Sequence, residues 1–162
     1  MHKLGKISYI DNITEWINDF SFKHEIKIRF SETDMFGHLN NTIPFTYFEE
    51  ARIEYFNSMG FMKDWTSAEC GEMPVVANLQ CDYLKQMFFN DQLTIHVKAD
   101  HIGNSSVDLH YMGTKQDGSI CLTGRGTIVQ VSKATGRPVA WTEEMKRSMW
   151  HTELNIPKNI SI

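Results

Sequence analysis

The sequence predicts an α+β domain in which a β-sheet wraps around one long helix. Residues 24–31 alternate as a strand does, with Ile26, Ile28 and Phe30 on one side. An aromatic-rich helical segment, residues 42–59, comes next, and four more segments with strand patterning follow it. A sheet must cover its apolar face, and this helix is the only large apolar partner that the pattern predicts. We therefore expect the sheet to fold over the helix.

Length and composition are those of one compact domain. The chain has 162 residues, of which 41% are hydrophobic and 12% aromatic, enough to bury a core. The net charge of −4 and the lack of a Lys/Arg run argue against a nucleic-acid partner. The sequence has no signal-peptide pattern and no apolar stretch of membrane-spanning length. Its three cysteines lack zinc-ligand or disulfide spacing, which suits free thiols in a reducing compartment, so we expect a cytoplasmic protein with no membrane partner.

The chain divides into an extension, one domain and a tail. Residues 1–23 are expected as an N-terminal extension in which residues 11–20 form a short helix. The domain is expected to span residues 24–141. Residues 142–162 are expected as a C-terminal helix and tail, because two acidic residues in the first turn favour a helix start.

The long helix is predicted from its ends and its apolar face. Thr42 is a plausible N-cap and Gly60 a plausible stop for residues 42–59. Arg52 falls inside the apolar face, where a guanidinium needs a partner, and Glu49 three residues earlier is the nearest candidate. At 100° per residue the apolar face consists of Phe45, Phe48, Tyr55, Phe56 and Met59.

Strand patterning continues after the helix, beyond an expected loop at residues 61–73. Gly124 and Gly126 lie on the inward face of the last strand, and their missing side chains suggest that something bulky, most simply the long helix, packs close. The four expected strands are residues 74–84, 91–100, 104–115 and 119–133.

Two histidines are considered as a metal site and rejected. A hairpin centred on Gly103 would place His96 and His110 opposite each other on the polar face of the sheet. Two histidines without a third ligand are more often solvated neighbours across two strands. Cys81 and Cys121 fit as small apolar strand residues, because no paired base supports a nucleophilic thiol.

Residues 32–41, which read ETDMFGHLNN, place chemically active groups directly before the helix. The start of a helix offers unpaired backbone N–H groups and a positive dipole end, which suit an oxyanion. Asp34 can fold back over that end, Gly37 lets the backbone approach a ligand, and Asn40 and Asn41 can orient a water or a carbonyl. This combination suits attack on an activated acyl group. The same residue types also serve as caps and turn formers, so the pattern alone leaves both interpretations open.

A resemblance to a known family covers roughly residues 24–141. The run RFSETDMFGHLNNTIPFTYFEEARIEYF (29–56) resembles the signature of hot-dog-fold acyl-CoA thioesterases of the 4-hydroxybenzoyl-CoA thioesterase type. That signature reads E/D-T-D-x-x-G-H-x-N-N, followed by a helix with Y-F-E-x-A-R-x-E. The segment VSKATGRPVAW (131–141) resembles the family's closing strand. The resemblance implies a five-stranded antiparallel sheet wrapped around one long central helix. It also implies homodimers paired edge to edge, larger assemblies such as homotetramers, and active sites at the dimer interface.

The resemblance also implies a reaction and residue roles. The reaction is hydrolysis of a thioester of coenzyme A, or in relatives of acyl carrier protein, with no cofactor. The catalytic carboxylate falls on Asp34, as nucleophile or general base, and backbone N–H groups near Asn41 would polarise the carbonyl. His38 either contacts substrate or, as we favour, fixes the loop. Glu49 is a second catalytic candidate, because another branch of the superfamily uses a carboxylate from the long helix. The residues expected to contact substrate are Gly37, Asn40, Phe45 and Phe48.

Two other functions stay open at this point. A hot-dog dehydratase or hydratase usually needs a pattern such as D-x-N-x-x-H, which the sequence lacks. A non-catalytic acyl-CoA-binding domain would keep the fold without turnover, and the presence of Asp34 disfavours it only in part. Some relatives carry His at the position of Asn41 and Tyr at the position of Phe30 or Pro44, so chemistry that depends on those groups is not expected here.

Overall fold

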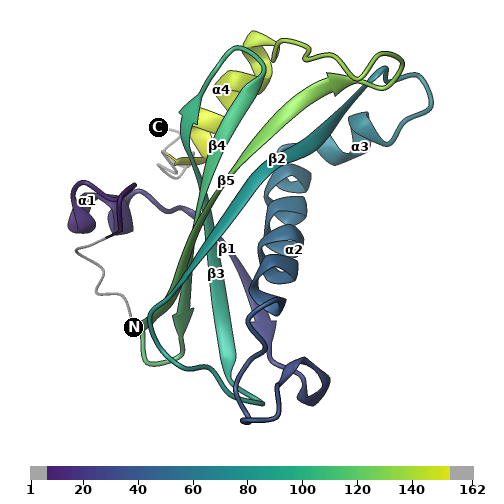
Figure 1. The fold of residues 1–162 in the computed structure, drawn as a ribbon. Coiled ribbons are helices and arrows are strands. Elements are labelled where there is room, and N and C mark those ends of the chain that lie inside the picture. Colours follow the sequence, from purple (N-terminus) through teal and green to yellow (C-terminus); the bar gives the residue numbers. More distant parts are fainter. Residues whose placement is uncertain (1–6, 154–162) are drawn as a thin grey trace, which may run out of the picture.

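The computed structural model describes residues 7–153, and Figure 1 shows one long helix, α2, enclosed by a curved sheet. No described helix is both long and apolar enough to cross a membrane. The elements, in chain order, are α1 (Ile13–Asn18), β1 (Phe22–Lys27), η2 (Phe30–Glu32), α2 (Ile43–Ser58), α3 (Phe61–Trp65), β2 (Glu72–Tyr83), β3 (Gln92–Ile102), β4 (Ser106–Lys115), β5 (Ile120–Ser132) and α4 (Glu143–Glu153).

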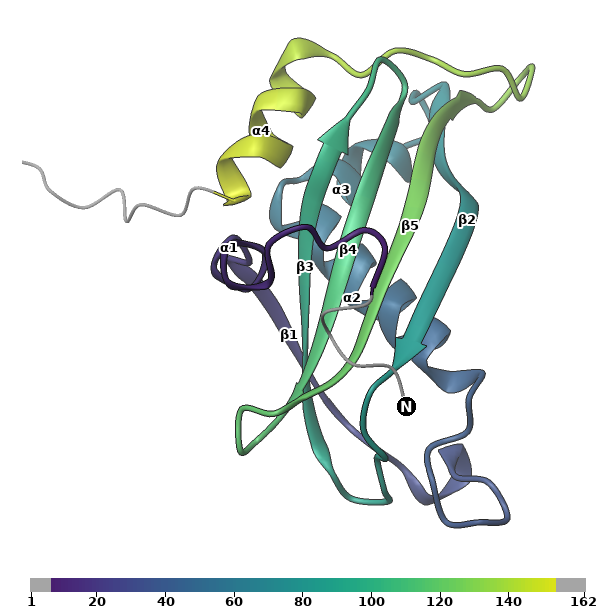
Figure 2. The same ribbon diagram turned by 60° about the vertical axis from the view of Figure 1, so that its left-hand side comes forward.

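The sheet has five strands in the order β1-β3-β4-β5-β2, and every neighbouring pair is antiparallel. Helix α2 lies on one face of it and the short helix α1 on the other (Figure 2). The α+β fold with a five-stranded antiparallel sheet wrapped around one central helix is therefore confirmed. Strands β1 and β2 are the two edges, so β2 leaves one row of backbone groups without a strand partner among the described residues.

Helix α2 begins and ends within one residue of the predicted limits. Phe48, at its centre, stacks on Tyr111 of β4 with ring centroids 4.4 Å apart. Thr42 is the N-cap residue, as predicted, but its side chain makes no cap hydrogen bond. The side chains of α2 that reach the core are Tyr47, Phe48, Ala51, Arg52, Tyr55 and Phe56.

Close packing of the sheet on α2 explains one of the two inward glycines. A Cβ atom at Gly124 would overlap the ring of Phe48, as the sequence predicts. At Gly126 a Cβ atom would lie 2.7 Å from Leu79 Cδ1 and 2.8 Å from the carbonyl oxygen of Asn78. The neighbour that excludes a side chain at Gly126 is thus strand β2, and the prediction of a helix contact there is wrong.

Two short helices replace an expected strand end and an expected loop. Strand β1 ends at Lys27, and the 3-10 helix η2 then turns the ring of Phe30 outward, where it is 74% exposed rather than inward-facing. The expected loop 61–73 contains helix α3, whose Phe61 and Trp65 are buried one turn apart. The strand prediction failed because a tight turn ends the alternation after Lys27, and the loop prediction missed a helix of only five residues.

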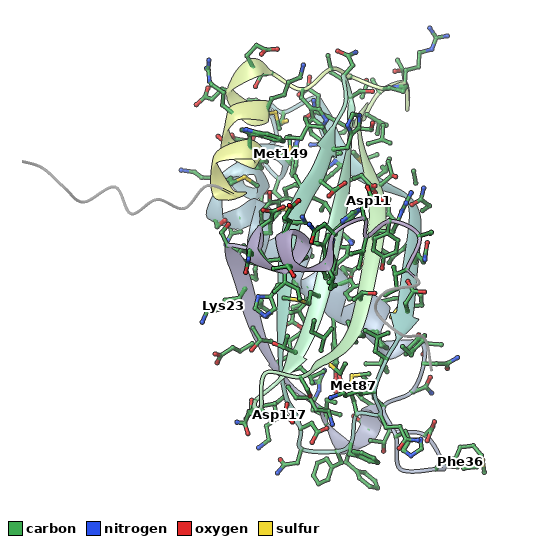
Figure 3. All side chains as sticks on the ribbon, turned by 90° about the vertical axis from the view of Figure 1, so that its left-hand side faces the viewer. Asp11, Lys23, Phe36, Met87, Asp117 and Met149 are labelled. Carbon is green, nitrogen blue, oxygen red and sulfur yellow. The ribbon has the colours of Figure 1, made fainter. Side chains whose placement is uncertain are left out.

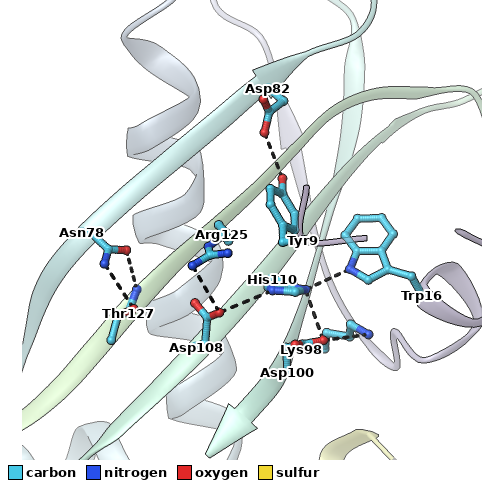
Figure 4. A network of polar contacts seen from close by, with 10 residues as sticks. All are labelled: Tyr9, Trp16, Asn78, Asp82, Lys98, Asp100, Asp108, His110, Arg125 and Thr127. Atoms are coloured by element: carbon cyan, nitrogen blue, oxygen red, sulfur yellow. Dashed lines mark hydrogen bonds and ion pairs between the residues drawn. The ribbon is translucent and has the colours of Figure 1, made fainter. Parts of the chain in front are cut away.

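The segment that contains α1 covers the outer face of the sheet, opposite α2 (Figure 2), and Figure 4 shows the polar contacts that Tyr9 and Trp16 make there. Trp16 Nε1 donates a 2.9 Å hydrogen bond to Nδ1 of the buried His110. The hydroxyl of Tyr9 lies 3.1 Å from Asp82 Oδ2 at the end of β2. The segment is held to the sheet through these side chains, without pairing as a strand.

The predicted facing of His96 and His110 is wrong. His96 is opposite Met112, and His110 is opposite Lys98. The link between β3 and β4 is centred beyond Gly103, and a bulge between Ala99 and His101 shifts the pairing again, so the register at His96 differs from the predicted one by two positions. His110 is buried under α1 instead of being solvated.

The network around His110 makes the stability depend on pH. Burial lowers the pKa of His110, although Asp100 and Asp108 nearby oppose that shift. The unfolded chain then binds the proton more readily than the folded one, so stability is lost as the pH falls below about 6.5 towards the folded-state pKa. Carboxylates with lowered pKa lose their contribution only below about pH 4.5, outside this window.

We expect the free energy of unfolding, measured by urea denaturation, to fall between pH 7 and pH 5.5. Burial also lowers the pKa of His96, so the comparison is made in a His96→Gln background. Adding His110→Gln should flatten the curve in this interval, because Trp16 no longer loses its acceptor to protonation. An unchanged slope after both substitutions would reject His110 as the source.

Candidate functional site

The loop before α2 is a closed hairpin. Thr33 and Leu39 form an isolated antiparallel bridge across it. The N–H of Asn40 donates a 2.8 Å hydrogen bond to the carbonyl of Glu32, which closes the hairpin three residues before the helix begins. Phe36 lies at its outer tip, 77% exposed (Figure 3). The loop is therefore ordered by its own hydrogen bonds and runs directly into α2.

The Asp34 carboxylate is fixed through one of its oxygens. Oδ1 accepts hydrogen bonds from the N–H groups of Phe36, at 2.9 Å, and His38, at 3.2 Å. Gly37 supports this turn with a φ of +78°, a conformation that other residues adopt only with strain. Oδ2 makes no hydrogen bond or ion pair within residues 7–153. One oxygen thus builds the loop, and the other is left for an external group.

The start of α2 leaves a backbone donor free in the same region. Asn40 Oδ1 accepts from both the N–H and the hydroxyl of Thr42, each at 3.1 Å, and the Asn40 carbonyl accepts from Ile43 N–H. Pro44 has no N–H. The N–H of the exposed Asn41 donates to no group in the described part of the chain. Asn40 therefore takes up the first amides of the helix, and Asn41 retains its own.

Tyr83, at the end of β2, is a neighbour of this site that the sequence did not single out. Its hydroxyl donates a hydrogen bond to the carbonyl of Asn41. Burial raises the pKa of Tyr83, so the phenol stays protonated and acts as a donor. The available signal was the alternation of residues 74–84, which places Tyr83 on the same face as the partly buried Cys81.

His38 contacts the segment between β2 and β3. Its ring packs edge-on against Phe88, with centroids 5.3 Å apart, and the two residues also form a bridge. Its carbonyl accepts the Asp34 N–H at 2.8 Å. These contacts are those of a residue that holds the loop, in keeping with the role that we favour, and a contact with substrate stays a prediction.

Glu49 lies away from the loop. Its carboxylate is 4.0 Å from Arg52 Nη2, so the predicted pairing is confirmed at the long end of the range. Arg52, which is buried, also donates to the hydroxyl of Tyr111 at 3.3 Å. Glu49 is six residues beyond Ile43, where α2 begins, a rise of about 9 Å along the helix, whereas the hairpin with Asp34 precedes that start. The two candidate carboxylates therefore belong to different places on the molecule.

A groove of about 280 Å³ runs between α2 and the edge strand β2. Glu49 and Arg52 lie at its polar side, and Ile53 and Val76, 40% and 47% exposed, are at its rim. The two aromatic residues expected to contact substrate do not line it: Phe48 is fully buried in the core, and Phe45 is half-buried beside it.

Five of the predicted site residues come together in one loop, and three do not. The five are Asp34, Gly37, His38, Asn40 and Asn41. Glu49, Phe45 and Phe48 lie along the helix. Within residues 7–153 no group of three or more His, Cys, Asp or Glu side chains could hold a metal ion, and Cys70, Cys81 and Cys121 are all free.

Comparison with known proteins relates the chain to thioesterases. Residues 28–149 match the family model described as "Thioesterase-like superfamily". The "Uncharacterized protein YsmA" of Bacillus subtilis (strain 168) is 47% identical over 146 residues, which cover 90% of this chain and 97% of that protein.

Solved structures agree with these sequence matches. A predicted thioesterase from Bacillus stearothermophilus superposes with a TM-score of 0.72 and 28% identity, over 81% of this chain and 95% of that one. A thioesterase from Thermus thermophilus, complexed with coenzyme A and Zn, gives a TM-score of 0.69 and 27% identity, over 83% and 96% of the two chains.

Proposed function

Because the chain belongs to the thioesterase-like superfamily, we propose that it is an acyl-CoA thioesterase in which Asp34 is the catalytic carboxylate. The observation that carries the proposal is the hydrogen bonding of the two oxygens of that carboxylate. One oxygen is held by two loop amides, and the other has no partner within the described residues. The hairpin that bears it leads directly to the free N–H of Asn41 at the start of α2. A fixed carboxylate with one free oxygen, close in sequence to an amide donor, suits attack on a polarised carbonyl.

The reaction converts a thioester and water into a carboxylic acid and a thiol. The Asn41 N–H would donate to the thioester oxygen and stabilise the negative charge that develops there. As a general base, Asp34 would take a proton from water while the water oxygen attacks the carbonyl carbon. The C–S bond then breaks, and the thiolate takes up that proton. As a nucleophile, Asp34 would instead attack the carbonyl carbon and break the C–S bond, which gives a mixed anhydride and a thiolate. Water then hydrolyses the anhydride to the free acid, the Asp34 carboxylate is restored, and the released proton goes to the thiolate.

The groove between α2 and β2 is the proposed acyl-binding region. The apolar rim of this groove favours a hydrophobic acyl or aryl group over a charged one. Strand β2 is also the proposed dimer edge. Strand β2 is a twelve-residue edge strand with exposed Met73 and Val76 next to the groove, and an unpaired edge of this kind is a template for a second strand. Pairing of two copies there would enclose the groove. The coenzyme A bound to the Thermus thioesterase supports a coenzyme A thioester as substrate.

The test is an assay of thiol release from a panel of acyl-CoAs with short, long and aromatic acyl groups. We expect thiol release that requires no added metal. Analytical ultracentrifugation of the same preparation should give a mass of twice the 18.8 kDa of one chain. Loss or gain of unsaturation without thiol release would instead identify a dehydratase or hydratase. Binding without any turnover would identify an acyl-CoA-binding domain, and either outcome overturns the proposed function.

A further inference from the structure

A buried carboxylate lies at the base of the hairpin, two residues before Asp34. Glu32 is 7% exposed, and its side chain accepts hydrogen bonds from Arg29 and Tyr47. The N–H of Arg29 lies 2.8 Å from Oε2, and the Arg29 guanidinium is 3.0 Å and 3.2 Å from Oε1. The hydroxyl of Tyr47 donates to Oε2 at 2.6 Å. Burial raises the pKa of Glu32, but the bonds from Tyr47 and Arg29 outweigh it and keep the group ionised.

These bonds connect the hairpin to the helix. Arg29 belongs to the same turn as Glu32, so its bonds hold the carboxylate in place without tying it to anything distant. Tyr47 is different, because it is buried in the second turn of α2, 15 residues away. The Glu32–Tyr47 bond is therefore a direct side-chain hydrogen bond between this turn and the helix.

The backbone of Glu32 fixes the other side of the site. Its carbonyl accepts the Asn40 N–H at 2.8 Å, one residue before Asn41. The side chain and the carbonyl of one residue thus set the place of the hairpin relative to the first turn of α2. The two groups of the proposed chemistry flank this closing hydrogen bond. Asp34 belongs to the hairpin that the bond closes, and Asn41 is the first residue after it.

We propose that Glu32 and Tyr47 are positioning residues, whose hydrogen bond sets the separation between the Asp34 carboxylate and the Asn41 N–H. This inference rests on the proposed thioester hydrolysis. A displacement of about 1 Å between reacting groups can cost on the order of a hundredfold in rate. The bond therefore acts on turnover through geometry, although neither side chain needs to touch the substrate.

The test is Tyr47→Phe, with Tyr55→Phe as the matched control. Both substitutions remove one hydroxyl from a buried tyrosine of α2. Tyr55 is eight residues further along α2 than Tyr47, and its hydroxyl donates to the backbone carbonyl of Met149 in α4. We expect Tyr47→Phe to lower kcat per folded molecule by about tenfold to a hundredfold with KM within about twofold of wild type. Tyr55→Phe should leave both constants unchanged.

A second variant tests whether the two residues act through one bond. Glu32→Gln is expected to lower kcat as Tyr47→Phe does, and the double variant should fall no further than the more impaired single variant. A purely structural role would lower the melting temperature and the folded fraction, but would leave kcat per folded molecule intact. If Glu32→Gln does not fold, Tyr47→Phe still decides, because it leaves Glu32 with its Arg29 donors.

The outcomes separate this inference from the proposed function. If Asp34→Asn is inactive while Tyr47→Phe turns over as fast as Tyr55→Phe, the positioning role is wrong and the proposed function stands. If Asp34→Asn turns over like wild type, the proposed function fails, whatever the tyrosine variants do.

Discussion

Asp34→Asn is expected to lower kcat for thiol release by about 10²-fold to 10⁴-fold, the contribution typical of a positioned acid or base. Asparagine is the informative replacement because its side-chain oxygen can still accept the N–H groups of Phe36 and His38. The loop should keep its shape while the charge is lost. Asp34→Ala should also abolish turnover while the protein stays folded, but it removes the loop acceptor together with the carboxylate.

The control for this variant is Asp117→Asn. Asp117 Oδ1 accepts the N–H of Ser119, two residues further on, just as Asp34 accepts that of Phe36. It lies in the turn between β4 and β5 (Figure 3). Loss of activity in Asp117→Asn as well would indicate a general effect of removing loop charges. Wild-type turnover in Asp34→Asn would reject the catalytic assignment outright.

Gly124→Val should have the largest effect on stability. The added side chain meets the ring of Phe48 on one side and the backbone oxygen of Gln80, 2.7 Å from the first added carbon, on the other. A ring can rotate, but a paired strand cannot move aside without breaking the β2–β5 ladder. Overpacking of a core costs about 1–3 kcal/mol and sometimes more, and we expect a loss of about 3 kcal/mol or more in the free energy of unfolding.

Urea denaturation of the glycine variants checks this expectation. Gly71→Ala is the control, because a Cβ atom at Gly71 would have no neighbour within 4 Å, and its effect should stay within about 0.5 kcal/mol. Gly124→Ala combined with Phe48→Leu should cost less than the sum of the two single changes, since each relieves the other. Strict additivity would mean that the Phe48 ring is not the obstacle.

The sequence predicts the central helix and the strands well because their signals are local and repeated. Periodicity over residues 42–59 and alternation in the later segments each draw on many side chains. The failures occur where a few residues change direction. Phe30 follows the strand alternation on paper, but η2 intervenes, and α3 is a five-residue helix that only the i, i+4 pair Phe61 and Trp65 could have indicated.

For the candidate site, the loop could be predicted and its supports could not. The residues of 32–41 are contiguous, so a motif is enough to collect them. Glu32 with Tyr47, and Tyr83 with Asn41, are pairs 15 and 42 residues apart that only the folded chain brings together. The register of His96 and His110 failed for a related reason, since it depended on the length of one turn.

The segment over the outer face of the sheet limits how copies of the chain can assemble. Tyr9 and Trp16 occupy the surface above His110, and Lys98 lies beneath the rings of Trp16 and Phe20. Another subunit could contact the outer face of the sheet at His110 only after these aromatic side chains are displaced. The β2 edge carries no such cover from the described residues. Extension of the sheet by a second copy at β2 is therefore easier than stacking of two sheets face to face.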